Sequence, residues 1–362
     1  MFMNAQSLGN KMNELCAVVC VEWPDIIAVN ETWTNDAIPS GLLNIPDYEI
    51  IGRSDRTDTA GGRGGGLIVY ARKEMCVWNC AVGADFNQCI SFKIKCGCED
   101  VNVHSVYRSP NSSVQNDEQI AKWIMDLRGT NILIGDFNFP DVDWEAGTSG
   151  ARGRRFYEAT QSKFMEQHVV GPTHISGSTL DLILSDREGI VSTVSRKGRL
   201  GKSDHEIVCF KLRVDAKRER DQQARLNYRR AKYNEMRAKL SETEWEIQLE
   251  GKAVNEMWIC IRDRIHKAIH EHTPMKKIKR RNEPPWMNSK MKKSIRDKRR
   301  AWTKWKETGR DSDKTDYKKK EAETKRMIKN GKNSWERRIM ECRKTKPKLF
   351  YSHLNRAKST KS

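Results

Sequence analysis

The sequence contains no apolar run that approaches the roughly 18 residues of a membrane-spanning helix. It opens Met1-Phe2-Met3-Asn4, without the charged, apolar and small-residue regions of a signal peptide, so we expect an intracellular chain with reduced thiols. Cys76 and Cys80 have no second cysteine pair at the spacing of a zinc site, and most of the ten cysteines are better interpreted as small buried residues.

A phosphate-binding P-loop is also missing. Residues 61–66 are rich in glycine, but the Lys-Ser/Thr pair of a P-loop does not follow them, and they precede an apolar strand-like run rather than a helix. We therefore interpret this run as a turn that leads into a strand.

Acidic and basic residues are unevenly divided along the chain. Residues 1–214 contain 22 Lys and Arg against 27 Asp and Glu, whereas residues 215–362 contain 45 against 21. The whole formal charge of +19 therefore comes from the second segment. A basic segment of this kind gains by displacing counterions from a polyanion, but charge alone equally fits a solvated helical surface.

Short apolar runs alternate with amphipathic stretches in the first segment, which predicts a protein of sheets and helices. The spacing of Met12, Leu15, Cys16 and Val19 predicts a helix over residues 10–21, and a second helix is predicted after Asn116 as N-cap. Strands are predicted at six apolar runs, which are 26–29, 67–70, 101–107, 132–134, 180–184 and 207–212.

The second segment lacks strand alternation, so we expect helix or disorder there. An apolar stripe that includes Trp258 and Ile265 predicts a helix over 252–272, and two more are predicted over about 287–308 and 313–343, around Gly309. Six of the eleven tryptophans lie in this segment, which argues against a wholly disordered tail.

Polar residues stand at the ends of the predicted strands, where a sheet holds side chains rigidly around one point. The motifs are Asn-Ala-Gln-Ser at 4–7, Glu-Thr-Trp at 31–33, Tyr-Arg-Ser-Pro at 107–110, Gly-Asp-Phe-Asn at 135–138, Pro-Thr-His at 172–174 with Leu-Asp-Leu at 180–182, and Ser-Asp-His at 203–205. Each motif alone is better explained by a turn, a surface acid or an N-cap. Their joint order favours a functional site.

In this order and spacing the motifs resemble the endonuclease domain of non-LTR retrotransposons, of the jockey and CR1-like branch, and more distantly apurinic endonucleases and DNase I. The resemblance implies an α/β (α+β) fold over residues 1–214, a four-layer αββα sandwich of two mixed β-sheets flanked by helices. Residues 215–362 then correspond to the basic helical linker that precedes a reverse transcriptase. No Tyr/Phe-x-Asp-Asp polymerase signature occurs, so we expect the chain to nick DNA but not to copy RNA.

The resemblance also implies a role for each residue of the site. The implied catalytic residues are Asp136, Asn138, His205, Asp181 and Tyr107; the implied ligands of Mg²⁺ or Mn²⁺ are Glu31, Asn4 and Asp204; and the implied phosphate or DNA contacts are Arg108, Asn138, Thr173, Ser203 and Lys202. A hard cation that keeps several waters needs only one or two carboxylates plus phosphate oxygens. Alignment of the attacking water and stabilisation of the negative charge that develops on the phosphate would then account for the rate of hydrolysis.

The implied partner is double-stranded DNA in the nucleus, with element RNA as a further partner of the basic tail and no membrane. Two alternatives remain open at this point. One is a phosphatase or RNA exonuclease on the same fold, and the other is a catalytically idle nucleic-acid-binding protein.

Overall fold

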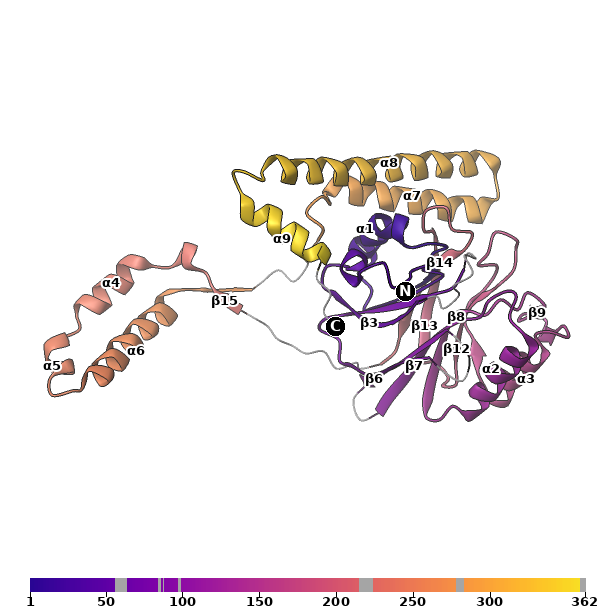
Figure 1. Cartoon of the computed structure of the whole chain (residues 1–362), viewed down its shortest axis with the longest axis horizontal. Helices are drawn as coiled ribbons and strands as arrows, with labels where there is room; N and C mark the ends of the chain where they lie inside the picture. Colours follow the sequence, from indigo (N-terminus) through magenta and orange to yellow (C-terminus); the bar gives the residue numbers. More distant parts are fainter. Residues whose placement is uncertain are drawn as a thin grey trace. The chain divides into compact units, whose positions relative to one another are not determined.

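The computed structural model of the chain describes residues 1–55, 64–83, 86, 88–96, 99–214, 224–277 and 283–358 (Figure 1). These residues form two compact units, of which one joins Met1–Glu219 with Asn282–Ser362 and the other is Arg220–Arg281. Residues 61–63 of the glycine-rich run lie outside the described residues. No helix in the described part of the chain is long and apolar enough to cross a bilayer.

Two six-stranded mixed sheets form the body of the first unit. The first sheet has the order β13-β14-β1-β2-β4-β3 and the second the order β11-β12-β8-β7-β6-β5. Strands β1 and β2 are parallel, as are β7 and β8, and the other pairs are antiparallel. The first sheet comprises β1 (Phe2–Asn4), β2 (Ile26–Asn30), β3 (Tyr48–Ser54), β4 (Leu67–Arg72), β13 (Val191–Arg199) and β14 (Glu206–Leu212). The second comprises β5 (Val77–Val82), β6 (Cys89–Cys96), β7 (Glu99–Tyr107), β8 (Thr130–Asp136), β11 (Glu166–Gln167) and β12 (Asp181–Ser185).

The two sheets pack face to face because alternate residues of each strand point to opposite sides. Phe2 and Val69 of the first sheet share a buried core with Val103 and Ile134 of the second. Their neighbours on the first sheet point outward and pack against α1 (Met12–Glu22). On the outer face of the second sheet lie α2 (Val114–Asp126) and α3 (Arg154–Ser162). The layers are therefore α, β, β and α, which confirms the predicted fold class.

The predicted strands are all present, with ends shifted by a few residues at most. The N-cap of α2 was predicted wrongly. The helix begins at Val114, and the hydroxyl of Ser113 accepts a hydrogen bond from the Asn116 N–H at 3.2 Å. Serine is as good a cap as asparagine, so the sequence alone does not separate the two positions. A short ribbon of β9 (Val142–Asp143) and β10 (Thr148–Ser149) precedes α3.

A helical hairpin from the basic segment packs on the first unit. It consists of α7 (Ser289–Thr308) and α8 (Asp311–Glu341), which confirm the two predicted helices on either side of Gly309, and α9 (Pro347–Lys358) follows. The Asn288 side chain caps α7, and Gly309 ends it with φ of 66°. Ile295 and Ile328 of the hairpin bury an apolar contact with Ala17 of α1.

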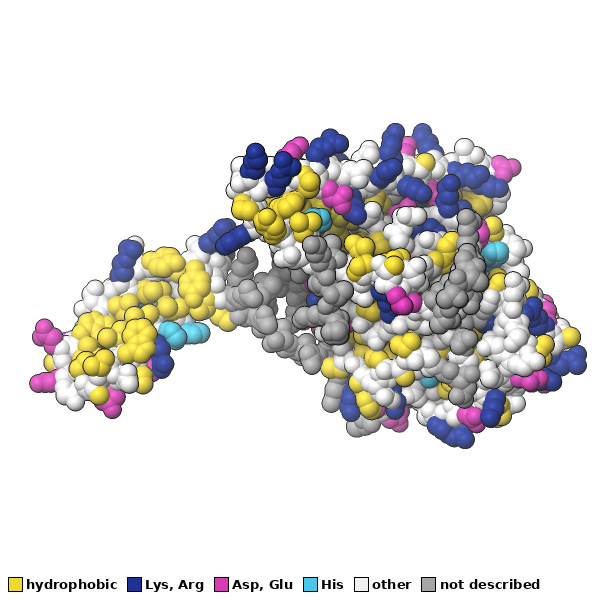
Figure 2. Space-filling view, viewed as in Figure 1, with side chains coloured by type: hydrophobic (Ala, Val, Ile, Leu, Met, Phe, Trp, Pro, Cys, Tyr) yellow, Lys and Arg dark blue, Asp and Glu magenta, His cyan; other side chains and the backbone are white. Residues whose placement is uncertain are grey.

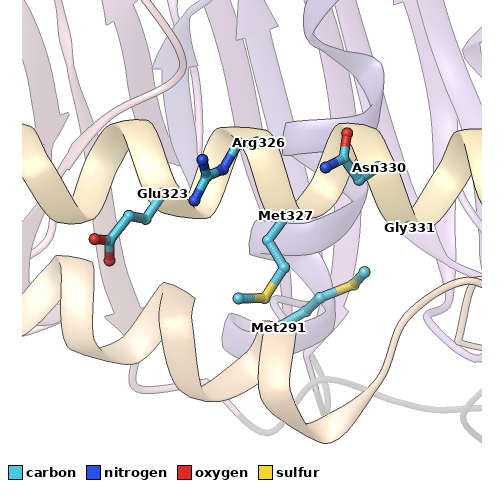
Figure 3. A pocket seen from close by; sticks show the side chains of 6 residues that line it. All are labelled: Met291, Glu323, Arg326, Met327, Asn330 and Gly331. Carbon is cyan, nitrogen blue, oxygen red and sulfur yellow. The ribbon is translucent and has the colours of Figure 1, made fainter.

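Gly331 lies where the two helices of the hairpin approach each other. Figure 3 shows Gly331 on α8 opposite Met291 on α7, beside a cavity that Met327 also lines. A Cβ at residue 331 would overlap the end of the Met291 side chain. A glycine within a helix weakens it by about 1 kcal/mol relative to alanine, so this residue is explained by the close approach of the two helices.

The second unit contains α4 (Tyr233–Ser241), α5 (Trp245–Leu249) and α6 (Val254–His272), of which α6 confirms the helix predicted over 252–272. Strands β15 (Ala224–Leu226) and β16 (Met275–Lys277) pair antiparallel across it. The sequence lacks alternation there because each strand is only three residues long. The structure thus divides the basic segment between the two units.

Candidate active site

Polar side chains from both sheets meet at one edge of the sandwich. In the first sheet Asn4 ends β1 beside Asn30 at the end of β2, and Glu31 follows directly. In the second sheet Asp136 ends β8, with Tyr107 at the end of β7 on one side and Asp181 at the start of β12 on the other. Strand register alone therefore brings residues that are far apart in sequence to the same place.

Direct contacts join these residues across the two sheets. The Asn4 amide Nδ2 donates to Asp136 Oδ2 at 2.8 Å. His205, just before β14, donates from Nδ1 to Asp181 Oδ2 at 2.9 Å, and its Nε2 lies 3.8 Å from Asp136 Oδ2. All four side chains are buried. Ligand atoms of Asp136, Asp181 and His205 lie within 4.8 Å of one another.

The electrostatics of this cluster favour a charged imidazole. Burial lowers the pKa of His205, but the charge of Asp181, its hydrogen bond and the charge of Asp136 outweigh burial and raise the pKa to about 9. Burial, and then the charge of Asp181, raises the pKa of Asp136 to about 7. The cluster thus holds a histidine that is protonated at neutral pH beside a carboxyl group poised near neutrality.

Glu31 faces the same edge and is held by two aromatic donors. The Tyr107 hydroxyl donates to Glu31 Oε1, and Trp33 Nε1 donates to Glu31 Oε2 at 2.8 Å. Burial and the Glu31 charge raise the pKa of Tyr107, so its phenol stays protonated.

The backbone is strained in the same motifs. Four of their non-glycine residues have φ between +41° and +54°, namely Gln6, Glu31, Trp33 and Asn138. Such strain gathers where side chains must be aimed for function.

Two residues of the site were missed by the sequence analysis. Gln6 Nε2 donates to Asp204 Oδ2 at 3.2 Å, and the Asp204 N–H donates to Gln6 Oε1 at 2.9 Å, so Gln6 orients Asp204. The His174 ring packs edge-on against His205 with 4.7 Å between centroids. Both lie within motifs that we had identified, which was the available signal.

Asn138 is only partly buried, and its Nδ2 donates to the Arg108 carbonyl at 2.8 Å. The Oδ1 atom of the same amide takes no part in that bond. Arg108 itself differs from expectation. Its side chain is fully buried, with Nε and Nη2 donating to the two Asp117 oxygens at 2.6 and 2.7 Å and Nη1 to the Asn138 carbonyl at 2.8 Å. The phosphate contact expected of Arg108 is therefore corrected to a structural role, which is to hold the Asn138 backbone.

Thr173 and Ser203 are corrected in the same way. Thr173 Oγ1 is buried and accepts the backbone N–H groups of Leu180 and Asp181 at 3.1 and 3.0 Å. Ser203 Oγ is buried and donates to the Asn4 carbonyl at 2.7 Å. Both hydroxyls hold backbone segments of the site. Lys202 is exposed, and its phosphate or DNA contact stays a prediction.

The arrangement suits a divalent cation at the Glu31 side of the cluster. Asp136 Oδ1 is buried and has no hydrogen-bond partner among the described residues, so a bound cation or water would satisfy it. Asn4, Glu31 and Asp204 offer only oxygen ligands, which Mg²⁺ prefers. His205 is a poor candidate ligand because Asp181 keeps it protonated and both ring nitrogens then carry protons.

Residues 101–209 match the model of a family described as endonuclease-reverse transcriptase, and this segment carries Asp136, Asp181 and His205. The predicted resemblance is confirmed at the level of this family, and the match does not specify a branch within it. No curated protein matches the sequence significantly. The fold and the acid and histidine cluster agree with this match, which covers less than half of the chain.

The structure is also similar to solved structures. An AP endonuclease from Archaeoglobus fulgidus is 15% identical over 59% of this chain and 98% of its own, with a TM-score of 0.46. The endonuclease domain of TRAS1, a telomere-specific non-LTR retrotransposon, is 14% identical over 59% and 97%, with a TM-score of 0.46. A 3′-5′ exonuclease from Neisseria meningitidis is 16% identical over 58% and 98%, with a TM-score of 0.48. These sequence identities and TM-scores are low, so the roles of the site residues rest on this chain's own contacts.

Proposed function

We propose that the chain is a Mg²⁺-dependent endonuclease that nicks double-stranded DNA in the nucleus and leaves a 3′-hydroxyl, the primer that insertion of a retrotransposon requires. The observation that carries the proposal is the contact of Asp136 with Asn4 and His205, because it joins the two sheets and places a carboxylate, an amide and a charged imidazole around one point. Mn²⁺ is the alternative ion.

The chain's own residues account for the hydrolysis as follows. Asp136 Oδ2 is held by Asn4, so Oδ1 is left to accept a proton from the attacking water. Water attacks phosphorus as the bond to the 3′-oxygen breaks, and this oxygen takes a proton from solvent water to become the 3′-hydroxyl. The 5′ side keeps the phosphate.

The charge that develops on the phosphate is met by donors already in place. His205, kept protonated by Asp181, donates from Nε2 to a phosphate oxygen, and Asn138 and the Tyr107 phenol supply further polar contacts. Glu31, Asn4 and Asp204 would hold the cation, which when bound acts as a Lewis acid on the phosphate. Asp181 acts through His205 and is a positioning residue.

A substrate panel tests the proposal against its alternatives. Equal amounts of the full chain are incubated with supercoiled plasmid, single-stranded RNA and a phosphorylated sugar, each with Mg²⁺ or with a chelator. We expect relaxation of the plasmid in Mg²⁺ only. Phosphate release from the sugar, or trimming of RNA with an intact plasmid, would show the phosphatase or exonuclease instead.

A further inference from the structure

A cavity of ≈ 190 Å³ lies between α1, the turn before Ser203, and helices α7 and α8. Its lining is largely apolar, but it also includes five cationic side chains drawn from three separate parts of the sequence, which are Arg199, Lys202, Lys298, Lys318 and Lys325. Glu14 and Glu321 are the two acids among its lining residues. The lining therefore carries an excess of positive charge.

These acids do not neutralise the cations one by one. Lys325 lies 3.9 Å from Glu14, and Glu321 accepts a hydrogen bond from the Tyr317 hydroxyl at 2.8 Å. Within the described ranges, no ion pair joins Lys202, Lys298 or Lys318 to an acid. Burial lowers the pKa of Lys298, although both acids oppose that shift. Cations gathered in this way repel one another, so an anion bound among them is stabilised.

The cavity adjoins the active site. Lys202 directly precedes Ser203, which bonds Asn4, and Asp204 follows. Gly201, also in the lining, lies against the stem of Lys11, whose Nζ donates to the Gln6 carbonyl at 2.8 Å. Gln6 in turn orients Asp204. A short chain of contacts therefore connects the basic cavity with the catalytic centre.

The cavity also opens onto a wider basic surface. Helices α7 and α8 contain 19 Lys and Arg against 9 Asp and Glu, and Figure 2 shows Lys and Arg side chains along both helices. Lys202, Lys318 and Lys325 are exposed, whereas Lys298 is partly buried beneath them. This change from exposed to partly buried lysines suits a ligand that enters from solvent and carries several negatively charged oxygens.

We propose that this cavity binds a backbone phosphate of the nucleic acid, next to the phosphate that is cleaved. Helices α7 and α8 then complete the substrate site. The proposal rests on the proposed function for the identity of the substrate. Lysine ammonium groups act as point charges on phosphate and read no bases, so the contact is independent of sequence. The slightly acidic segment 1–214 thereby receives its substrate through charges supplied by the C-terminal hairpin.

A pair of matched double variants tests it. Lys298→Met with Lys318→Met removes two charges from the cavity, and Lys293→Met with Lys319→Met removes two exposed charges of the same helices outside it. Both are made in the Asp136→Asn background, so that binding is read without cleavage. Fluorescence anisotropy with a labelled random-sequence duplex gives affinity across a salt series, and the melting temperature of each variant reports folding.

The cavity pair is expected to weaken binding about tenfold at 0.1 M salt and to reduce the slope of log affinity against log salt by about 0.9, the value for one phosphate. The control pair is expected to change both much less. Equal effects of the two pairs would overturn the proposal in favour of diffuse charge. If the cavity pair lowers the melting temperature, the single variant Lys318→Met, at an exposed position, replaces it. Its duplex affinity and salt slope are then compared with those of Lys319→Met.

The outcome is separable from that of the proposed function. Loss of binding by the cavity pair with no nicking by the parent chain keeps the phosphate site and rejects the nuclease. Nicking by the parent chain with no difference between the pairs keeps the nuclease and rejects the site.

Discussion

The ammonium group of Lys306 on α7 lies 2.8 Å from Glu206 Oε1, and Glu206 is the residue that follows His205. Glu206 is buried and also lies 3.5 Å from Arg196 of β13. The buried ring of Trp302, one turn earlier on α7, packs over Gly198. The C-terminal hairpin thus supports the turn that carries His205.

Replacement of Lys306 with methionine keeps the apolar stem and removes the charge. Glu206 would then keep only Arg196 as a cationic partner, and a buried carboxylate that loses a partner costs about 1–3 kcal/mol. We expect a lower free energy of unfolding by urea denaturation and a lower nicking rate. Lys319→Met, an exposed lysine on α8, is the control and should change neither. Equal stability of the two variants would show that the contact is incidental.

A chain that ends at Val214 should be much less stable than the full chain. It loses Ile295 and Ile328, which cover Ala17 of α1, and each fully buried isoleucine contributes about 1.5–3 kcal/mol. We expect a lower melting temperature and stronger binding of a dye that detects exposed apolar surface. The matched control replaces residues 220–281 with a flexible Gly-Ser linker and keeps α7 and α8. That control should melt close to the full chain, and a melting temperature as low as that of the shortened chain would contradict the account.

Three substitutions in the cluster should reduce turnover more than binding. Asp136→Asn, His205→Gln and Asp181→Asn preserve shape but remove the base, the cationic donor or the group that keeps the donor protonated. Loss of a general base or of a transition-state donor costs roughly 10²–10⁴-fold in rate. Rates at saturating plasmid and duplex affinities are measured for each variant. A large loss of affinity with an unchanged rate would assign these residues to binding.

The buried imidazole of His104 predicts a loss of stability in mild acid. Burial lowers its pKa to about 4 from an ordinary value of 6.5, so the folded state holds the neutral ring. Its contribution is complete above pH 6.5 and is lost as pH falls toward 4, a few kcal/mol at about 1.4 kcal/mol per pKa unit. Ser91 Oγ lies 2.8 Å from Nδ1, and the ring packs edge-on against Trp123.

Urea unfolding at pH 7.5 and pH 4.5 measures this effect. The variant His104→Gln keeps a polar group near Ser91 and cannot take up a proton. We expect it to lose less stability than the parent chain between the two pH values, whereas His266→Gln, at an exposed position, should follow the parent chain. An identical pH response of parent and His104→Gln would place the acid sensitivity elsewhere.

The strands and the meeting of the motif residues at one edge could be predicted because each motif directly follows or precedes an apolar run. Strand register then determines which residues are neighbours, since Asp136 must lie between Tyr107 and Asp181 once β8 pairs with β7 and β12. Side-chain direction could not be predicted. Arg108 follows Tyr107 by one residue, yet it points to Asp117 of α2, because neighbouring residues of an extended segment face opposite sides.

Packing of the C-terminal segment could not be predicted either. The apolar residues of α7 and α8 that contact α1, such as Ile295 and Ile328, are few and lie among many lysines and arginines, so the charge dominates the pattern. Helix periodicity predicted the two helices but not which surface they cover. Contacts such as Lys306 with Glu206 join residues a hundred positions apart, and nothing local in the sequence indicates them.

Metal-dependent nicking at the Asp136 centre is tested most directly with supercoiled plasmid. The full chain and Asp136→Asn are incubated with plasmid in Mg²⁺, and the products are offered to a DNA polymerase with labelled nucleotides. The parent chain should give nicked circles whose 3′ ends are extended, with none in chelator and a rate at least about 10²-fold lower for Asp136→Asn. Nicks that no polymerase extends, or equal nicking by Asp136→Asn, would contradict the account.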